Sequence, residues 1–182
     1  MPCKSRLPDR KMNDRPIVIT GFMASGKTVV AEALGGVLGS ASVDLDGEIT
    51  RREGDTPAEI ICGKGEEAFR AIETRTLQRV LEENSAVVIA LGGGAWMIAG
   101  NRALLERYQS LSVWLDAPFE LCWKRILNAG SKRPLAPDKE TARSLFAQRL
   151  PSYERATLRI PIVEDDKVGE IASRIAAALE SC

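Results

Sequence analysis

Histidine is absent from this chain of 182 residues, and neither sign of charge is in excess, because 25 lysines and arginines balance 25 aspartates and glutamates. Without histidine, a histidine-based nucleophile triad, proton shuttle or metal site is excluded. The even charge balance argues against a general nucleic-acid binder and against a protein that binds anionic membranes, since both normally carry an excess of basic residues. We therefore expect no nucleic-acid partner and no membrane partner.

Long apolar runs are also missing. The longest uncharged stretch, which includes residues 86–100, is interrupted by three consecutive glycines and is shorter than the roughly 20 apolar residues that a membrane span needs. Residues 1–14 carry mixed charge and lack the apolar segment of a secretory signal. We expect them to form a polar, poorly ordered tail ahead of a single domain over residues 15–182.

Cysteine is scarce, and the spacing of the cysteines is not that of a metal site. The four cysteines lie far apart and form no C-x-x-C pair. We therefore expect neither a disulfide framework nor a structural zinc site, and we expect a reducing, cytoplasmic location. Cys62 and Cys122 are expected to be buried as small apolar side chains.

The residues that are present predict an α/β fold. Hydrophobic residues make up 45% of the chain, which is enough for a folded core. Short apolar runs alternate with longer amphipathic ones, a pattern typical of a mostly parallel sheet with helical connections. The runs that predict strands are 16–20, 41–43, 86–91, 111–115 and 159–163, and those that predict helices are 26–38, 66–83, 102–108, 119–127, 140–155 and 168–179.

A phosphate-binding loop follows the first expected strand. Residues 21–28, Gly-Phe-Met-Ala-Ser-Gly-Lys-Thr, fit the pattern G-x-x-x-x-G-K-[ST] at the start of an expected helix. Gly21 and Gly26 let the backbone curl so that its N–H groups point inward, and the helix N-terminus adds partial positive charge. Lys27 can reach the β- and γ-phosphates, and the Thr28 hydroxyl can bind Mg²⁺. The alternative is a glycine-rich turn with an exposed lysine.

Three classes of protein share this loop: switch GTPases, ATPase motors and small-molecule kinases. Two acidic residues at the end of the next apolar run help to choose among them. Asp44 and Asp46 follow the run 41–43, at the sheet edge where α/β proteins bind ligands. Period-two spacing would place both on one side of a strand, one facing a metal and the other an acceptor hydroxyl. The alternative is a helix N-cap, which Asp46 could provide. A switch GTPase is disfavoured because the chain has no N-K-x-D motif, which such proteins use for guanine. An ATPase motor is disfavoured because such a protein usually has an acidic residue at the end of a strand, whereas strand 86–91 ends in Gly92-Gly93-Gly94.

One segment departs from the even charge balance. Residues 124–160 contain nine lysines and arginines and three acids, a local balance of 9 − 3 = +6. Glycine and proline within residues 128–139 predict a mobile loop. This segment is either a solvated basic face or a basic lid over a polyanion.

The ordered set of motifs resembles the shikimate kinase family over the chain from residue 16 to its end. The matching elements are the loop 21–28, Asp-Leu-Asp at 44–46, Gly-Glu-Glu-Ala-Phe-Arg at 65–70 followed by Glu73, Leu-Gly-Gly-Gly at 91–94, Arg-Pro-Leu at 133–135, and Arg149 with Tyr153. The resemblance implies a three-layer αβα P-loop kinase fold with a central five-stranded parallel sheet. It also implies a mobile lid at about 128–140, a substrate-binding helical region at about 45–75, and a monomer.

The resemblance also implies the reaction and its residues: transfer of the γ-phosphoryl group of Mg-ATP to the 3-hydroxyl of shikimate. The implied catalytic residues are Asp46, Lys27 and Arg133, and the implied shikimate ligands are Asp46, Arg70, Gly92, Gly93, Gly94 and Arg149. The implied nucleotide-binding residues are Met23, Ala24, Ser25, Gly26, Lys27, Thr28, Val29, Arg125 and Arg133. Mg²⁺ would be held by Thr28 and, through water, by Asp44. Glu73, three residues after Arg70 on one helix, could orient that arginine.

Several positions depart from the family pattern. Ala24 replaces a glycine that is common there, and we expect a methyl group facing outward to be tolerated. Ile61 replaces a common pocket phenylalanine, and Glu164–Asp166 replace a segment that often supplies an arginine to the adenine. Two alternatives stay open: a kinase for another small carboxylated polyol such as aminoshikimate or gluconate, and a nucleotide-gated binding protein without catalysis.

Overall fold

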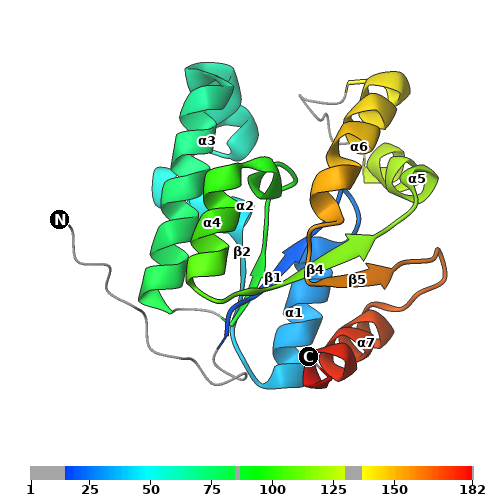
Figure 1. Ribbon diagram of the computed structural model, residues 1–182. Helices are drawn as coiled ribbons and strands as arrows, with labels where there is room; N and C mark the ends of the chain where they lie inside the picture. Colours follow the sequence, from blue (N-terminus) through cyan, green and yellow to red (C-terminus); the bar gives the residue numbers. More distant parts are fainter. Residues whose placement is uncertain (1–14, 85–86, 130–136, 182) are drawn as a thin grey trace.

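The computed structural model describes residues 15–84, 87–129 and 137–181 (Figure 1). The expected N-terminal tail 1–14 and the central part of the expected lid, with Arg133, lie outside the described residues. The same holds for Cys3 and Cys182.

A five-stranded parallel sheet forms the centre of the fold, in the order β2-β3-β1-β4-β5. The strands are β1 (Ile17–Thr20), β2 (Ser42–Asp44), β3 (Val88–Ala90), β4 (Leu111–Asp116) and β5 (Leu158–Pro161). All residues of β1 and β3 are buried, as expected of parallel strands covered on both faces. The expected α/β class and the five-stranded parallel sheet are therefore confirmed.

The strand order places three loops side by side at the carboxyl edge of the sheet. Asp44 pairs with Ala90, so the end of β2 lies beside the end of β3. Ile19 pairs with Ala90 on the other side, so the loop after β1 is the next neighbour. The chain leaves β1 toward β2 on one side and reaches β4 and β5 on the other, which makes this edge the place where α/β sheets bind ligands.

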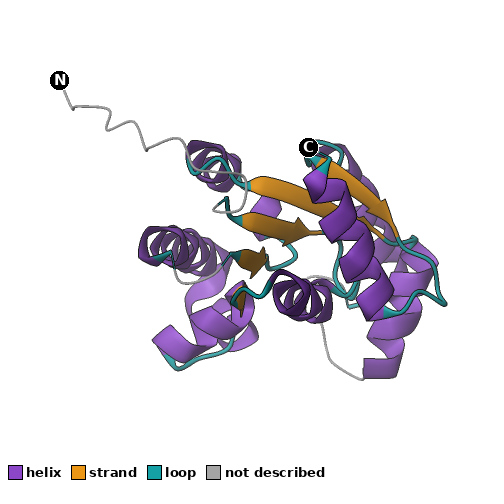
Figure 2. Ribbon diagram, turned by 90° about the horizontal axis from the view of Figure 1, so that it is seen from below, coloured by secondary structure: helices purple, strands orange, loops and turns teal. Residues whose placement is uncertain are grey.

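Helices surround the strands, as Figure 2 shows. Figure 1 shows α2, α3 and α4 grouped on one side of the molecule and α5 and α6 on the other, while α1 packs against α7. The bounds are α1 (Lys27–Leu38), α2 (Leu45–Glu53), α3 (Pro57–Glu83), the short 3₁₀ helix η2 (Ala95–Met97), α4 (Ala99–Arg107), α5 (Phe119–Ala129), α6 (Lys139–Tyr153) and α7 (Val168–Glu180).

The expected elements are present, with shifted ends and two additions. The periodic pattern did not predict α2, which lies in the helical region that the resemblance implies at about 45–75, and α3 begins nine residues before the expected start at residue 66. Thr56 starts α3 with a capping box: its hydroxyl accepts from the Glu59 N–H, and Glu59 accepts from the Thr56 N–H, with Pro57 in the first turn. The helix is interrupted at Gly65, where φ is 86° and ψ is 164°. That interruption explains why the periodic pattern predicts only its second part.

The two described cysteines divide between core and surface. Cys122 is fully buried among the apolar residues of α5, as expected. Cys62 is exposed on α3, so the prediction of burial is wrong for this residue. It lies in the part of α3 before the Gly65 interruption, where the periodic pattern did not predict a helix, so the pattern did not show which way its side chain faces.

Candidate active site

The loop after β1 has the curled backbone that phosphate binding requires. Gly21 has a φ of 147° and Gly26 a φ of 99°, values that favour glycine. A Cβ at Gly21 would also lie 2.9 Å from the carbonyl oxygen of Leu115, so there is no room for a side chain. Lys27 Nζ donates a hydrogen bond of 2.9 Å to the Phe22 carbonyl oxygen, which folds the lysine back over the loop. The loop therefore has the form of an anion cradle at the N-terminus of α1.

Ala24 lies in the left-handed region, with a φ of 59°. An L-residue other than glycine, asparagine or aspartate adopts this conformation at a cost of about 1–2 kcal/mol. The sequence predicts that alanine is tolerated at this position, and the structure adds that any strain here comes from the backbone conformation and not from the direction of the methyl group.

The two acids after β2 occupy different elements. Asp44 ends the strand and caps α2: its Oδ1 accepts the Gly47 N–H at 2.9 Å, and its Oδ2 accepts the Thr28 hydroxyl at 2.5 Å. Asp46 lies in the first turn of α2. The period-two prediction is therefore wrong, as is the alternative that Asp46 is the cap, because the helix starts two residues earlier than expected. Both acids nevertheless line the same cavity as Lys27.

This cavity, which we call the phosphate cavity, has a volume of about 470 Å³. The expected nucleotide-binding residues of the loop, Met23 through Val29, all line it, and so does Arg125. Arg125 Nη1 lies 3.3 Å from the Ala24 carbonyl oxygen, which ties α5 to the loop. Asp166, from the acidic segment before α7, also lines the cavity, and its carboxylate accepts from Arg174 at 2.7 Å.

A second cavity of about 420 Å³, which we call the arginine cavity, is also lined by the triglycine segment. Gly93 lines the phosphate cavity and Gly94 lines the arginine cavity. Arg70 and Arg149 both line the arginine cavity. The structure thus brings the expected arginine pair together, next to the phosphate cavity and not inside it.

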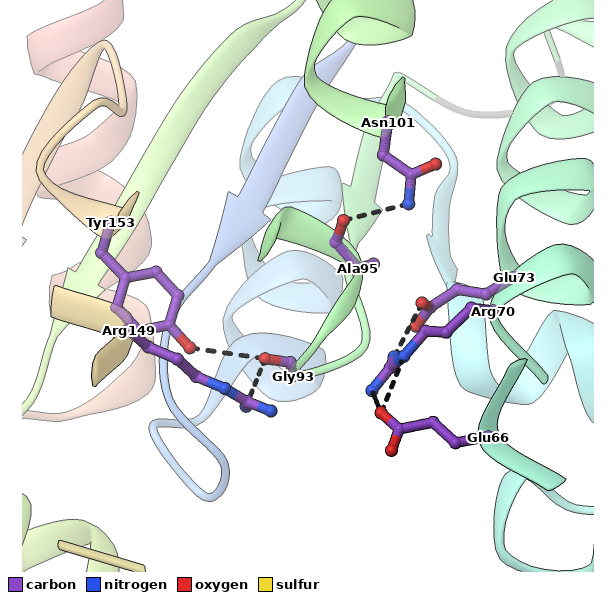
Figure 3. Close-up of polar contacts among 8 residues, drawn as sticks. All are labelled: Glu66, Arg70, Glu73, Gly93, Ala95, Asn101, Arg149 and Tyr153. Atoms are coloured by element: carbon purple, nitrogen blue, oxygen red, sulfur yellow. Dashed lines mark hydrogen bonds and ion pairs between the residues drawn. The ribbon is translucent and has the colours of Figure 1, made fainter. Parts of the chain in front are cut away.

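Arg149 is held from the α6 side (Figure 3). Its Nη1 donates a 2.6 Å hydrogen bond to the Gly93 carbonyl oxygen, and the Tyr153 hydroxyl approaches the same oxygen at 3.4 Å. Burial raises the pKa of Tyr153 to about 12, so it stays a neutral donor. Because Arg149 is only 6% exposed, its direction is fixed before any ligand arrives.

Arg70 is held from the α3 side by two glutamates (Figure 3). Its Nη1 donates to Glu73 at 2.8 Å, and its Nη2 and Nε donate to Glu66 at 3.0 and 3.3 Å. The Nη1 and Nη2 atoms lie over Gly94, where an added Cβ would be 2.5 Å from each. The expectation that Glu73 orients Arg70 agrees with this geometry, whereas the pairing with Glu66 was not foreseen.

Glu73 is the carboxyl group most altered by its surroundings in this region. Burial raises its pKa from 4.5 to about 6; Arg70 opposes this change and the nearby charge of Asp46 adds to it. A Cβ on Gly92 would lie 2.5 Å from Asp46 Oδ1 and 2.9 Å from Glu73 Oε1. Gly92 is therefore needed so that the two carboxyl groups can approach the chain here.

Further contacts join η2, which follows the triglycine segment, to α6 and α4, and sequence reasoning did not find them. Trp96 Nε1 donates to the Ser152 carbonyl oxygen at 2.7 Å. Arg102 Nη1 donates to the Trp96 carbonyl oxygen at 2.6 Å. Both contacts are accepted by backbone oxygens, one in α6 and one in η2, and a residue pattern carries no signal for such contacts.

The donor set suits a metal that is shared with a ligand. Within residues 15–84, 87–129 and 137–181, no group of three or more Cys, Asp or Glu side chains could hold a metal ion by itself. The Thr28 hydroxyl and the Asp44 carboxylate lie together at the phosphate cavity. Two oxygen donors beside a phosphate site are what Mg²⁺ uses when phosphate oxygens complete its shell.

In the same described residues, no helix is long and apolar enough to cross a membrane.

Comparison with known proteins identifies the family. The family model described as shikimate kinase matches residues 23–180. The chain belongs to the shikimate kinase family. A shikimate kinase from Cereibacter sphaeroides is 39% identical over 91% of this chain and 82% of the relative, and one from Nostoc punctiforme is 36% identical over 87% of each.

Solved structures agree. A shikimate kinase from Acinetobacter baumannii in complex with shikimate superposes with a TM-score of 0.84, at 32% identity, over 92% of this chain and 93% of that one. The family and the enzyme class that the motifs predict, a P-loop kinase of the shikimate pathway, are thereby confirmed for this chain.

Proposed function

We propose that this chain transfers the γ-phosphoryl group of ATP, bound with Mg²⁺, to the 3-hydroxyl of shikimate, giving ADP and shikimate 3-phosphate. The observation that carries the proposal is the position of Asp46. Its carboxylate lines the phosphate cavity and lies against Gly92, next to Gly93 and Gly94, which line the phosphate cavity and the arginine cavity respectively. An acceptor held by the arginines would thus present a hydroxyl to Asp46 and to the phosphate cradle together.

The acceptor would be held by its carboxylate. A guanidinium binds a carboxylate through two parallel hydrogen bonds and stays charged at all working pH values. Arg70 and Arg149 come from opposite sides of the arginine cavity (Figure 3). Together with the backbone of Gly92–Gly94, they would fix the ring so that one face points to the phosphate cavity.

The phosphoryl donor would lie in the cradle of residues 23–29. The loop amides and Lys27 would neutralise the β- and γ-phosphates, and Arg125 lies at the edge of the same cavity. Mg²⁺ would be held by Thr28 and, through water, by Asp44, and when bound it would offset charge on the phosphate oxygens. Asp46 would orient the acceptor hydroxyl and accept its proton. Arg133 as a further phosphate ligand on a lid, a cytoplasmic location and a monomeric state stay predictions.

The first prediction concerns Asp46. We expect Asp46→Asn to lower kcat at least about 100-fold, the lower range for removal of a general base, while ATP affinity changes little. Asp55→Asn is the matched control, because Asp55 is exposed and its ion pair with Lys64 is a long one of 3.8 Å. The measurement is shikimate-dependent ADP formation in Mg²⁺ buffer, with ATP affinity from calorimetry. Full activity of Asp46→Asn would remove this residue from its proposed role.

The same assay separates the alternatives. Aminoshikimate and gluconate offered as acceptors test whether the arginine cavity serves another carboxylated polyol. A nucleotide-gated binding protein would bind ATP and form no ADP with any of these acceptors.

A further inference from the structure

Glu66 occupies the edge of Arg70 that a carboxylate ligand would use. One oxygen of Glu66, Oε1, accepts from both Nε and Nη2 of Arg70. These two nitrogens form the side of a guanidinium that grips a carboxylate with two parallel hydrogen bonds. The opposite end, Nη1 and Nη2, lies over Gly94, where even an added Cβ would be 2.5 Å away. The side held by Glu66 is therefore the one open to a ligand.

The two glutamates on Arg70 differ in how firmly they hold it. The Glu73 side chain is 1% exposed and that of Glu66 is 52% exposed. A buried ion pair that loses one partner leaves a charge without compensation, so Glu73 is a permanent partner. An exposed pair four residues apart on a helix is weak and screened by water. Glu66 is thus the partner that can leave.

The position of Glu66 in α3 also allows it to leave. It is the first residue after the Gly65 interruption, where the backbone has left the helical conformation. It also lines the arginine cavity together with Arg70 and Arg149. Its carboxylate thus lies where the carboxylate of an acceptor would have to lie.

We propose that Glu66 is a placeholder carboxylate, which holds the ligand edge of Arg70 in the empty enzyme and is displaced when the carboxylate of the acceptor binds. The inference rests on the proposed function, because it assumes that Arg70 binds shikimate. Displacement of Glu66 costs part of the binding free energy of the acceptor. Glu66 therefore sets the affinity for carboxylated acceptors and favours those whose carboxylate can form both hydrogen bonds.

The experiment measures shikimate affinity by calorimetry for the wild type, Glu66→Gln, Glu66→Ala and the control Glu67→Gln. Glu67 is exposed, lies next to Glu66 and carries the same charge, so its variant reproduces the change in net charge. We expect both Glu66 variants to bind shikimate about two- to fivefold more tightly, the range that corresponds to an exposed ion pair. We expect Glu67→Gln to match the wild type and all four proteins to bind ATP equally.

The outcomes separate the inference from the function it rests on. Weaker shikimate binding by the Glu66 variants would show that Glu66 positions Arg70 for the ligand, and unchanged binding would show that no competition exists; either result overturns the proposal. If the wild type itself binds no shikimate while Arg70 and Arg149 are intact, the proposed function fails first. Because Glu66 is half exposed, its variants should fold, and their thermal unfolding verifies this.

Discussion

At the scale of the residue, Glu73 carries the clearest consequence for pH. Its pKa of about 6, raised from 4.5 chiefly by burial, means that the folded chain keeps a proton on Glu73 at pH values where the unfolded chain has lost it. This contribution to stability is complete below pH 4.5 and is lost as the pH rises through 6. The difference between these two pKa values corresponds to about 2 kcal/mol of unfolding free energy.

We therefore expect the free energy of unfolding of the wild type to lose about 2 kcal/mol, relative to Glu73→Gln, between pH 4.5 and pH 7. Urea unfolding of both proteins across this range measures the difference, and Glu67→Gln serves as an exposed control that follows the wild type. A constant difference between wild type and Glu73→Gln would mean that Glu73 titrates normally in the folded chain.

Single residues also show where sequence reasoning ends. The glycines and Lys27 of the phosphate loop were predictable, because their spacing requires a specific backbone shape. The direction of the Asp46 side chain was not predictable, because it depends on whether β2 continues or a helix begins at Leu45. Asp44 decides this by capping α2, and a two-residue spacing cannot distinguish a strand end from a first helical turn. Both acids still reach the expected cavity, since strand end and first turn lie at the same sheet edge.

At the scale of the element, the interruption of α3 is the feature with a direct test. Gly65 adopts φ 86° and ψ 164°, a conformation that only glycine reaches without strain. Gly63, two residues earlier, is helical, and neither glycine has an atom within 4 Å of an added Cβ. The two positions thus differ in backbone conformation and not in available space.

We expect Gly65→Ala to lower the free energy of unfolding by about 1–3 kcal/mol. The control Gly63→Ala should raise it by about 0.5–1 kcal/mol, because alanine is the better residue inside a helix. Urea denaturation of the two variants measures both. Equal effects of the two substitutions would show that α3 can pass through residue 65 as a regular helix.

At the scale of the whole molecule, counting charges along the chain predicted less than the motifs did. Part of the basic excess of 124–160 is paired with acids from outside the segment: Lys124 pairs with Glu164, and Lys139 pairs with Glu120 at 2.8 Å. Arg159 pairs with Asp116 at 2.6 Å. Such exposed pairs contribute about 0–1 kcal/mol each, so they add little to the stability of the fold, and the basic lid that includes Arg133 stays a prediction. The mostly parallel sheet, in contrast, was predictable from short apolar runs that alternate with amphipathic ones.

The site itself is assembled by the whole fold, and ligand binding should therefore stabilise the whole chain. Arg70 comes from α3, Arg149 from α6 and Gly93 from the segment after β3. Shikimate at 100 times its Kd should add about 2.7 kcal/mol to the free energy of unfolding. For a chain of this length, each kcal/mol raises Tm by about 2–4 °C.

We expect Arg149→Ala to lose this shikimate-dependent rise in Tm while keeping the rise caused by Mg-ATP, because Arg149 lines the arginine cavity and is not among the residues found around the phosphate cavity. Differential scanning fluorimetry of wild type and variant, each compared with its own ligand-free Tm, measures both shifts and removes any general destabilisation by the substitution. If Arg149→Ala kept the shikimate shift, the acceptor would be bound without this arginine. If it lost both shifts together, the two cavities would not be separate binding sites but one cooperative unit.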